Sequence, residues 1–236
     1  MLVRTLRVEI AVFTVRAGRL ETALLRERAN TWRLPGAAVE ATGTLQDAAE
    51  RALAEETGVR NADPEQLFTF DRDGGEGAAV TYLALVHAGA HPLAPGRDVV
   101  EVRWFAWGDV PELAADQAET LRYGRERLRA KAAYAPVAER LVAAEFTISE
   151  LQGVYEAVLG RRLDARNFRR DLTSAGVVEP LERTRATGPG RPATLYRWSS
   201  DAEGFSVSAA ERRLARTLAA SDEEPARGQT TVPSQG

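Results

Sequence analysis

The sequence predicts an α+β protein built from two domains. Five strand-like segments surround one helical segment in the first hundred or so residues. Beyond about residue 135 the apolar residues recur at helical spacing, and two short strand-like segments follow them. A chain of 236 residues is long enough for two modest domains, each with its own core.

The first domain is expected to begin with a strand pair and a helix. Residues 7–16 and 20–27 alternate apolar and polar residues on either side of an Ala-Gly-Arg turn. A helix is predicted from about Leu45 to Thr57, where Gly58 ends it. Further strands are expected within 65–72, 78–88 and 101–107, because segments rich in Gly and Pro separate them. A long helix within 112–134 then leads the chain out of this domain.

The second domain is expected to hold three helices and a β-hairpin. The first helix is inferred from the spacing of Tyr134, Val137, Ala138, Leu141 and Val142. A capping box at Thr147 and Glu150 opens the second, and Asp164 caps the third. Strands over 177–182 and 194–198 flank a turn-rich segment. This order predicts a winged helix-turn-helix domain.

The expected domain boundaries are 1–132 for the first domain and 133–199 for the winged helix-turn-helix domain. Residues 200–236 are expected to add a helix over 208–220 and a disordered tail. The absence of cysteine excludes disulfide scaffolds, thiolate zinc sites and cysteine nucleophiles. The N-terminus lacks the apolar core of a signal peptide, and no segment is apolar enough to span a bilayer. A cytoplasmic protein with no membrane partner is therefore expected.

Charge is distributed unevenly along the chain. The net charge is −3, yet residues 158–198 carry nine arginines against four acidic residues, so that this segment holds +5 and the rest −8. A basic region on an acidic chain is typical of a nucleic-acid footprint confined to one domain.

The third helix of the second domain divides into two faces. Ala165, Phe168, Leu172 and Ala175 fall on one face and are expected to dock the helix. The candidate DNA-binding residues of the other face are Arg166, Asn167, Arg169, Arg170 and Thr173. Arginine pairs with phosphate or guanine and asparagine with adenine, so this face fits a major groove.

The hairpin adds three basic candidates, since Arg183, Arg185 and Arg191 are placed to reach backbone phosphates or a minor groove. The alternatives are a solvated charged face and a protein-binding winged helix. DNA binding is favoured because a capped helix-turn-helix, a basic helix face and a basic hairpin coincide.

The segment from Thr31 to Val59 resembles the Nudix box, with the pattern G-x5-E-x7-R-E-U-x-E-E-x-G-U, where U is aliphatic. The matching residues are Arg51, Leu53, Glu55, Glu56, Gly58 and Val59, preceded by "WRLPG". The sequence departs from the pattern at Ala37, Gly43 and Ala52. The resemblance implies an α/β/α sandwich with a mixed sheet.

The intact box binds Mg²⁺ or Mn²⁺ through glutamates on one helix face. Because Ala52 replaces one of them, Glu55 and Glu56 are expected to hold a metal weakly, if at all, and Glu40 is a further candidate from the loop. Arg51 is expected to orient a glutamate four residues later. We therefore expect a vestigial, effector-binding box at Arg51, Glu55 and Glu56, no catalytic residue and no required cofactor.

Two aromatic residues near strand ends, Trp32 and Phe105, are candidates for stacking on a base, although aromatic residues in such positions more often belong to the core. For the face formed by Arg51, Glu55 and Glu56, the competing interpretation is a solvated, salt-bridged surface.

Together the two halves resemble the NrtR family, Nudix-related transcriptional regulators of NAD metabolism. The resemblance is carried by "FTISELQGVYEAVLGRRLDARNFRRDL", "GRPATLYRW" and "RLRAKAAYAP". It implies a repressor that binds palindromic double-stranded operators as a homodimer and is released by ADP-ribose or a related nucleotide. A rotation transmitted through residues 112–134 would change the spacing of the DNA-reading helices.

Two other functions remain open from the sequence. One is a Nudix hydrolase, an ADP-ribose pyrophosphatase with an accessory winged-helix domain. The other is a nucleotide-binding adaptor whose winged helix contacts protein.

Overall fold

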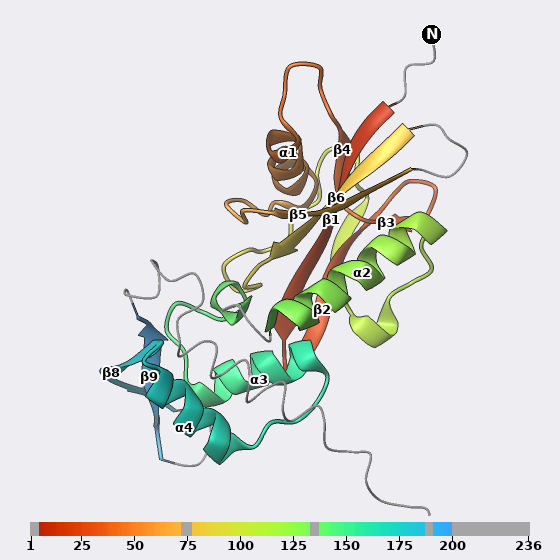
Figure 1. Cartoon of the computed structure of the whole chain (residues 1–236). Helices are drawn as coiled ribbons and strands as arrows, with labels where there is room; N and C mark the ends of the chain where they lie inside the picture. The colour runs from red at the N-terminus through yellow and green to blue at the C-terminus, as the bar shows by residue number, and fades with distance from the viewer. Residues whose placement is uncertain (1–4, 72–76, 133–136, 187–190, 200–236) are drawn as a thin grey trace, which may run out of the picture.

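The computed structural model describes residues 5–71, 77–132, 137–186 and 191–199. Within these residues seven strands form one mixed sheet, shown in Figure 1. Its main path runs β3 (Trp32–Arg33), β2 (Arg19–Arg26), β1 (Thr5–Arg16), β6 (Gly77–Leu85) and β5 (Glu65–Asp71). The strand β4 (Gly36–Ala38) pairs with β1, and β7 (Glu101–Ala106) pairs with β2. Only the β1–β6 pair is parallel among these, so the sheet is mixed as expected.

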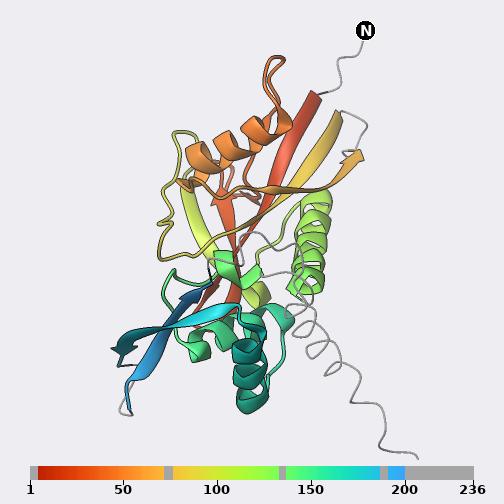
Figure 2. The same ribbon diagram turned by 60° about the vertical axis from the view of Figure 1, so that its left-hand side comes forward.

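Helices cover both faces of this sheet. The helix α1 (Leu45–Thr57) packs on one face, and α2 (Ala115–Ala132) lies against the other, as Figures 1 and 2 show together. The central strand β1 is buried on both sides, with Ile10 in the cluster beneath α1 and Phe13 in the cluster beneath α2. Successive side chains of a strand point to opposite faces, which explains this division. The expected α/β/α sandwich is confirmed.

Short-range sequence features set the ends of these elements. The β1–β2 turn places Ala17 and Gly18 at φ values of 47° and 73°, which matches the two left-handed residues of a type I′ hairpin. Helix α1 begins with a capping box between Thr44 and Asp47 and ends at Gly58, whose φ is 77°. The predicted limits of this helix are therefore confirmed.

Close packing of the backbone explains the glycine of the "LPG" segment before the box. Gly36 opens β4, which runs antiparallel beside β1. A Cβ atom at this position would lie 2.4 Å from the carbonyl oxygen of Val8. Only glycine therefore lets β4 approach β1 so closely, and this approach brings the loop before β4 over helix α1.

The second domain has the predicted order with one exception. The helices α3 (Ile148–Leu159) and α4 (Ala165–Ala175) precede the hairpin of β8 (Val178–Arg185) and β9 (Ala193–Trp198). A bridge between Phe146 and Tyr196 extends this small sheet by one residue pair. The capping residues Thr147 and Asp164 both accept the expected backbone hydrogen bonds.

The prediction of a helix at the start of this domain is wrong. Residues 137–140 form a single 3-10 turn, η3 (Val137–Arg140), and the chain then turns again. The apolar residues of the turn, Val137, Ala138, Leu141 and Val142, are nevertheless buried. Their spacing reflected burial on one side of a short segment, which a single turn provides as well as a helix does.

The two domains share one hydrophobic core. Leu128 and Ala132 near the end of α2 pack in the same cluster as Leu151 of α3 and Phe168 of α4. Figure 2 shows the end of α2 pointing toward the layer that holds α3 and α4. The winged domain is therefore packed against the sandwich, and α2 contributes to the core of both.

The expected helix at 208–220 and the tail lie outside the described residues, and so do Tyr134 and the first residues after the expected boundary between 132 and 133. Among the described helices, none is long and apolar enough to cross a membrane.

We expect Thr147→Ala to lower the free energy of unfolding by about 1 kcal/mol, because α3 loses its side-chain cap. Urea unfolding followed by circular dichroism measures this effect. Thr42→Ala, in an exposed loop, is the control and should change stability little. An equal midpoint for Thr147→Ala and wild type would contradict the role of the cap.

Candidate functional sites

Glu56 of the Nudix-like helix is held by a residue that the sequence analysis did not select. Both Nη atoms of Arg33 donate to its carboxylate, at 2.6 and 3.0 Å. The backbone N–H of Gly36 donates to the same carboxylate at 2.8 Å. Arg33 also binds Glu27 at 2.6 Å. A cation therefore already occupies the position beside Glu56.

The pair of Arg33 and Glu56 is partly shielded from water, since each side chain is about 20% exposed. Burial by itself would lower the pKa of the Arg33 guanidinium, but the bonds to Glu56 and Glu27 outweigh burial and raise it. The arginine is thus charged at all ordinary pH values. A bidentate pair of this kind also fixes the orientation of both side chains.

The other residues of the box are arranged differently from the expectation. Arg51 forms an ion pair with Glu40 at 3.2 Å, which places Glu40 beside the arginine and not in a metal set. Glu55 is exposed on the surface of α1, where the expected orientation by Arg51 is not seen among the described contacts. Ala52 is 1% exposed and packs in the apolar cluster beneath α1. Position 52 therefore contributes an apolar side chain to the core and no carboxylate to the box.

The donor set does not fit a divalent metal. Of the box carboxylates, Glu56 is neutralised by Arg33, Glu55 points outward and position 52 carries a methyl group. Within the described residues no three His, Asp or Glu side chains gather as a possible metal site. Metal ions of this class need several oxygen ligands on one side, and α1 does not supply them here.

A pocket of about 960 Å³ opens on the other side of Arg33. It lies between the start of β1, the β2–β3 turn and the segment that leads into α2. Its polar lining residues are Arg7, Glu9, Glu27, Asn30, Thr31, Arg33, Glu112 and Gln117. This volume is in the range of pockets that hold small organic ligands.

The two aromatic candidates pack against each other, and one of them lines this pocket. The rings of Trp32 and Phe105 meet edge to face with centroids 4.6 Å apart. Phe105 is buried, so it belongs to the core, whereas Trp32 lines the pocket and is half-buried. The guanidinium of Arg103 covers both rings, at 5.2 Å from Trp32 and 4.3 Å from Phe105. Trp32 alone of the two is placed to contact a ligand.

The pocket is connected directly to α2. The backbone N–H of Leu34 donates to the side chain of Gln117 at 3.1 Å, which ties the loop after β3 to the first turn of α2. Residues 111–114 form the opposite wall. The pocket thus contacts the start of the helix whose other end packs against the winged domain.

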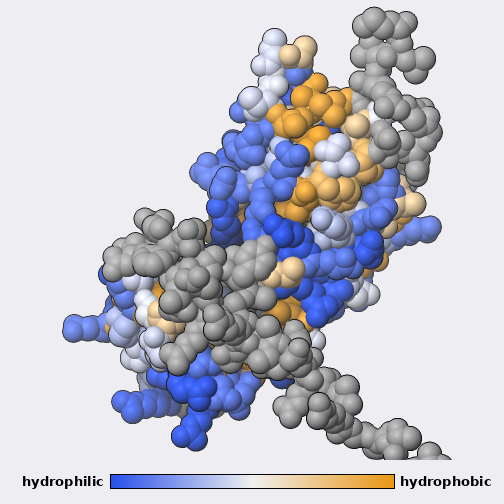
Figure 3. All heavy atoms as spheres, viewed as in Figure 1, coloured by the Kyte–Doolittle hydropathy of each residue, from blue (hydrophilic) through white to orange (hydrophobic). Residues whose placement is uncertain are grey.

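Helix α4 presents its basic face to solvent. Arg166, Asn167, Arg169, Arg170 and Thr173 are all exposed, while Phe168 and Leu172 are buried as predicted. Figure 3 shows hydrophilic residues at the lower end of the molecule, where α4 lies. Ala165 differs from the expectation, since this first residue of α4 is exposed.

Neighbouring groups already orient several side chains of this face. A nitrogen of the Arg169 guanidinium lies 3.4 Å from the hydroxyl oxygen of Tyr196, and Arg170 pairs with Asp171 at 2.9 Å. The Thr173 hydroxyl donates back to the carbonyl of Arg169 at 2.9 Å. The Asp164 carboxylate accepts from the backbone N–H of Asn167 at 2.7 Å. The side chain of Asn167 is exposed.

Two of the three hairpin arginines already pair with carboxylates. Arg183 binds Glu145, and Arg185 binds Glu150 at 2.9 Å and the carbonyl oxygen of Glu145 at 3.2 Å. Arg191 is exposed two residues before β9. A phosphate would have to compete with carboxylates for the first two side chains, while Arg191 faces solvent.

A sandwich with a degenerate Nudix helix, followed by a winged helix with a basic recognition helix, defines a Nudix-type regulator. Family models agree with this class. The NUDIX domain matches residues 5–124, and the NrtR DNA-binding winged helix domain matches residues 139–198. The chain belongs to the NrtR family.

Named relatives support this assignment over most of the chain. An Acinetobacter baylyi protein described as an ADPR responsive transcriptional repressor is 31% identical over 207 residues, which cover 81% of each chain. The crystal structure of Shewanella oneidensis NrtR complexed with a 27mer DNA is 31% identical, with a TM-score of 0.72 over 85% of this chain and 96% of that one. The NUDIX domain of that protein complexed with ADP ribose is 27% identical, with a TM-score of 0.50 over 54% of this chain and 90% of that one.

Proposed function

We propose that this protein is a transcriptional repressor of NAD metabolism genes that binds operator DNA through α4 and releases it when an NAD-derived nucleotide occupies the Nudix domain. The observation that carries the proposal is that one helix, α2, forms part of the pocket at its start and of the winged domain's core at its end. The relative named as an ADPR responsive repressor supports the same combination.

The DNA-binding surface in this proposal is the exposed face of α4. Arg166, Asn167, Arg169 and Arg170 enter the major groove, where guanidinium and amide groups read base edges. Arg191 reaches the backbone beside it. Arg183 and Arg185 contribute only if DNA phosphates displace their carboxylate partners, so their effect on affinity is expected to be smaller.

The proposed effector is ADP-ribose or a related nucleotide in the pocket beside Trp32. An adenine or ribose ring can lie against Trp32, and the hydroxyl groups can donate to Glu9, Glu27 or Glu112. Arg7 and Arg33 are the cations of this pocket, and a diphosphate would share Arg33 with Glu27 and Glu56. In this proposal the vestigial box residues Arg51, Glu55 and Glu56 affect the ligand mainly indirectly, because Glu56 holds the loop around Arg33 and Gly36.

We further propose that the Nudix domain does not hydrolyse its ligand. The metal in an active box activates water and neutralises the diphosphate. Here Arg33 supplies a fixed positive charge beside Glu56, and Ala52 removes another ligand. Binding without cleavage suits a sensor, because a sensor that destroyed its effector would erase its own signal.

The coupling between the two sites is proposed to pass through α2. An effector must bind the DNA-free conformation more tightly than the DNA-bound one. Movement of residues 111–117 on ligand binding would rotate α2, and the shared core would carry this rotation to α3 and α4. In a homodimer on a two-fold operator, such a rotation changes the distance between the two recognition helices.

The homodimer itself is part of the proposal. Apolar residues gather on the upper part of the N-terminal domain in Figure 3, and Leu6, Val100 and Tyr123 are large exposed apolar residues of that domain. Exposed apolar surface of this kind is typical of a protein interface. A two-fold dimer also accounts for a palindromic operator.

One experiment tests the function and its two alternatives together. An operator duplex is first selected by the protein from a random-sequence library, and binding is then titrated with and without ADP-ribose while AMP release is assayed in the same samples. We expect tight, salt-dependent binding that ADP-ribose weakens by at least about tenfold, corresponding to a coupling of about 1.4 kcal/mol. Rapid AMP release with Mg²⁺ or Mn²⁺ would favour the hydrolase, and failure to enrich any duplex would favour the adaptor.

A further inference from the structure

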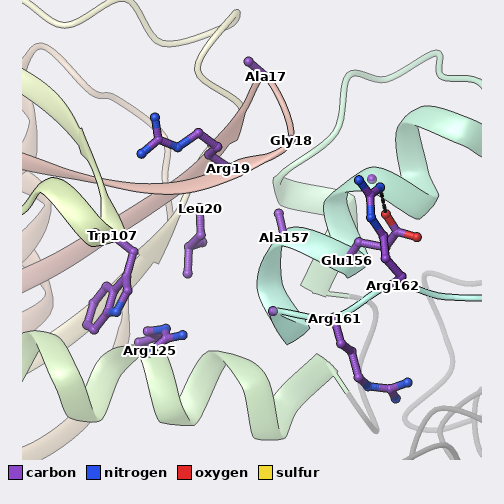
Figure 4. Close-up of a pocket in the computed structure, with 13 residues that line it drawn as sticks. Ala17, Gly18, Arg19, Leu20, Trp107, Arg125, Glu156, Ala157, Arg161 and Arg162 are labelled. Atoms are coloured by element: carbon purple, nitrogen blue, oxygen red, sulfur yellow. Dashed lines mark hydrogen bonds and ion pairs between the residues drawn. The ribbon is translucent and has the colours of Figure 1, made fainter.

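A second cavity lies between the two domains. It has a volume of about 630 Å³ and is distinct from the pocket beside Trp32, with which it shares no lining residue. The sandwich contributes the β1–β2 turn, Trp107 and Arg125 of α2. The winged domain contributes Glu156 and the residues that follow α3. Figure 4 shows these two walls facing each other.

The walls of this cavity are strongly cationic. The charged residues that line it are Arg19, Arg125, Glu156, Arg161 and Arg162. Four positive charges therefore face one negative charge.

The single carboxylate is already saturated by its own domain. Glu156 accepts hydrogen bonds from the N–H of Leu163 at 2.9 Å, from Gln152 at 3.0 Å and from Arg162 at 2.8 Å. Burial by itself would raise the pKa of this carboxyl, but these bonds outweigh burial and lower it. Glu156 thus stays ionised and holds Arg162, as the dashed line in Figure 4 indicates. On the opposite wall Arg19 pairs with Asp109 at 2.7 Å, which leaves Arg125 as the cation to be matched.

Arg125 is the central cation of the opposite wall. Its guanidinium lies 4.4 Å from the ring centroid of Trp107, which fixes the position of the charge. Its Nε is buried, and it has no hydrogen-bond partner within the described residues. Burial, with the nearby charge of Arg129, lowers the pKa of this guanidinium. A positioned, partly desolvated cation without a hydrogen-bonded anion is costly, and an anionic ligand would offset that cost.

We propose that this cavity binds a small phosphate-bearing ligand, held by Arg125 from the sandwich and by Arg161 and Arg162 from the winged domain. Arginine is suited to phosphate because its planar donors bind two oxygens at once. The volume accommodates a diphosphate or the phosphate end of a nucleotide. Because the ligand touches both domains, its binding stabilises their present arrangement.

The test is calorimetric titration of the full chain with inorganic pyrophosphate at low ionic strength. Wild type is compared with Arg125→Gln and Arg161→Gln, which remove one cation from each wall. The control is Arg122→Gln, which removes an exposed arginine from α2 outside the cavity. Arg33→Gln removes a cation from the other pocket and separates binding there from binding here. Thermal melting without ligand shows that each variant is folded.

We expect pyrophosphate binding to weaken about tenfold or more in Arg125→Gln and Arg161→Gln, because each loses a charged hydrogen bond, and to be retained in Arg122→Gln. Equal isotherms in wild type and both cavity variants would overturn the proposal, and so would loss of all binding in Arg33→Gln. A parallel titration with ADP distinguishes the two sources of phosphate: tighter binding than pyrophosphate, lost in the same variants, identifies a nucleotide. The inference is independent of the repressor function, since no operator DNA enters the measurement.

Discussion

Replacing Arg169 and Arg170 together by alanine is expected to weaken operator binding by about a hundredfold, since each arginine contact with a base edge is worth about 1–3 kcal/mol. Both side chains are exposed on α4, so their removal leaves the buried contacts of Phe168 and Leu172 intact. Fluorescence anisotropy with a labelled operator duplex at fixed salt measures the loss. The salt dependence should also become shallower, because fewer phosphate counterions are released.

The control for this measurement is Arg122→Ala, which removes an exposed arginine from the first domain. It changes the net charge by the same amount per residue without touching α4. Comparable losses in Arg122→Ala and in the α4 variant would show that charge alone, rather than the face of α4, sets operator affinity. Unchanged operator binding in the α4 variant would exclude this helix as the reading element.

Arg33→Gln is expected to weaken ADP-ribose binding by about tenfold to 150-fold, since the diphosphate loses a charged hydrogen-bond partner worth about 1.5–3 kcal/mol. The carboxylates of Glu27 and Glu56 then lose the cation that both contact, and they repel the phosphates more strongly. Isothermal titration with ADP-ribose measures the affinity. Operator binding without effector should stay close to wild type, whereas release by ADP-ribose should need a proportionally higher concentration.

Two further variants make this prediction discriminating. Arg28→Gln is the control, because Arg28 is exposed near the pocket without lining it. Arg33→Lys keeps the charge but loses the bidentate geometry, so an intermediate affinity is expected. If Arg33→Gln binds ADP-ribose as wild type does while Arg51→Gln does not, the box arginine inferred from sequence is the effector contact and Arg33 is structural.

Motif spacing alone did not identify the arginine that contacts the box carboxylate. Arg51 was selected because it stands at a fixed spacing from Glu55 in a helix. In the folded protein it pairs with Glu40 from the preceding loop, and the residue that reaches the box carboxylate comes from β3, more than twenty residues earlier. Helical spacing describes neighbours on one helix, but it contains no information about a strand that packs across it.

Element limits were predicted best where a local interaction sets them. The helix expected from Leu45 is ended by Gly58, and the helices expected after Thr147 and Asp164 begin at those caps. The segment at 137–142 was assigned wrongly because its apolar spacing fits a helix and a buried turn equally well. Burial of such a short segment is decided by the elements around it.

By itself, the sequence determined the class of the two domains, the basic face of α4 and the loss of a carboxylate at Ala52, because these depend on residue types within a few turns of one chain segment. Only the tertiary structure decided that Arg33 neutralises Glu56, that α2 joins the pocket to the winged domain, and that two walls of arginines face each other between the domains. Each of these results from contacts between segments that are distant in the chain. Such contacts depend on how the sheet, α2 and α3 pack, and no local spacing contains that packing.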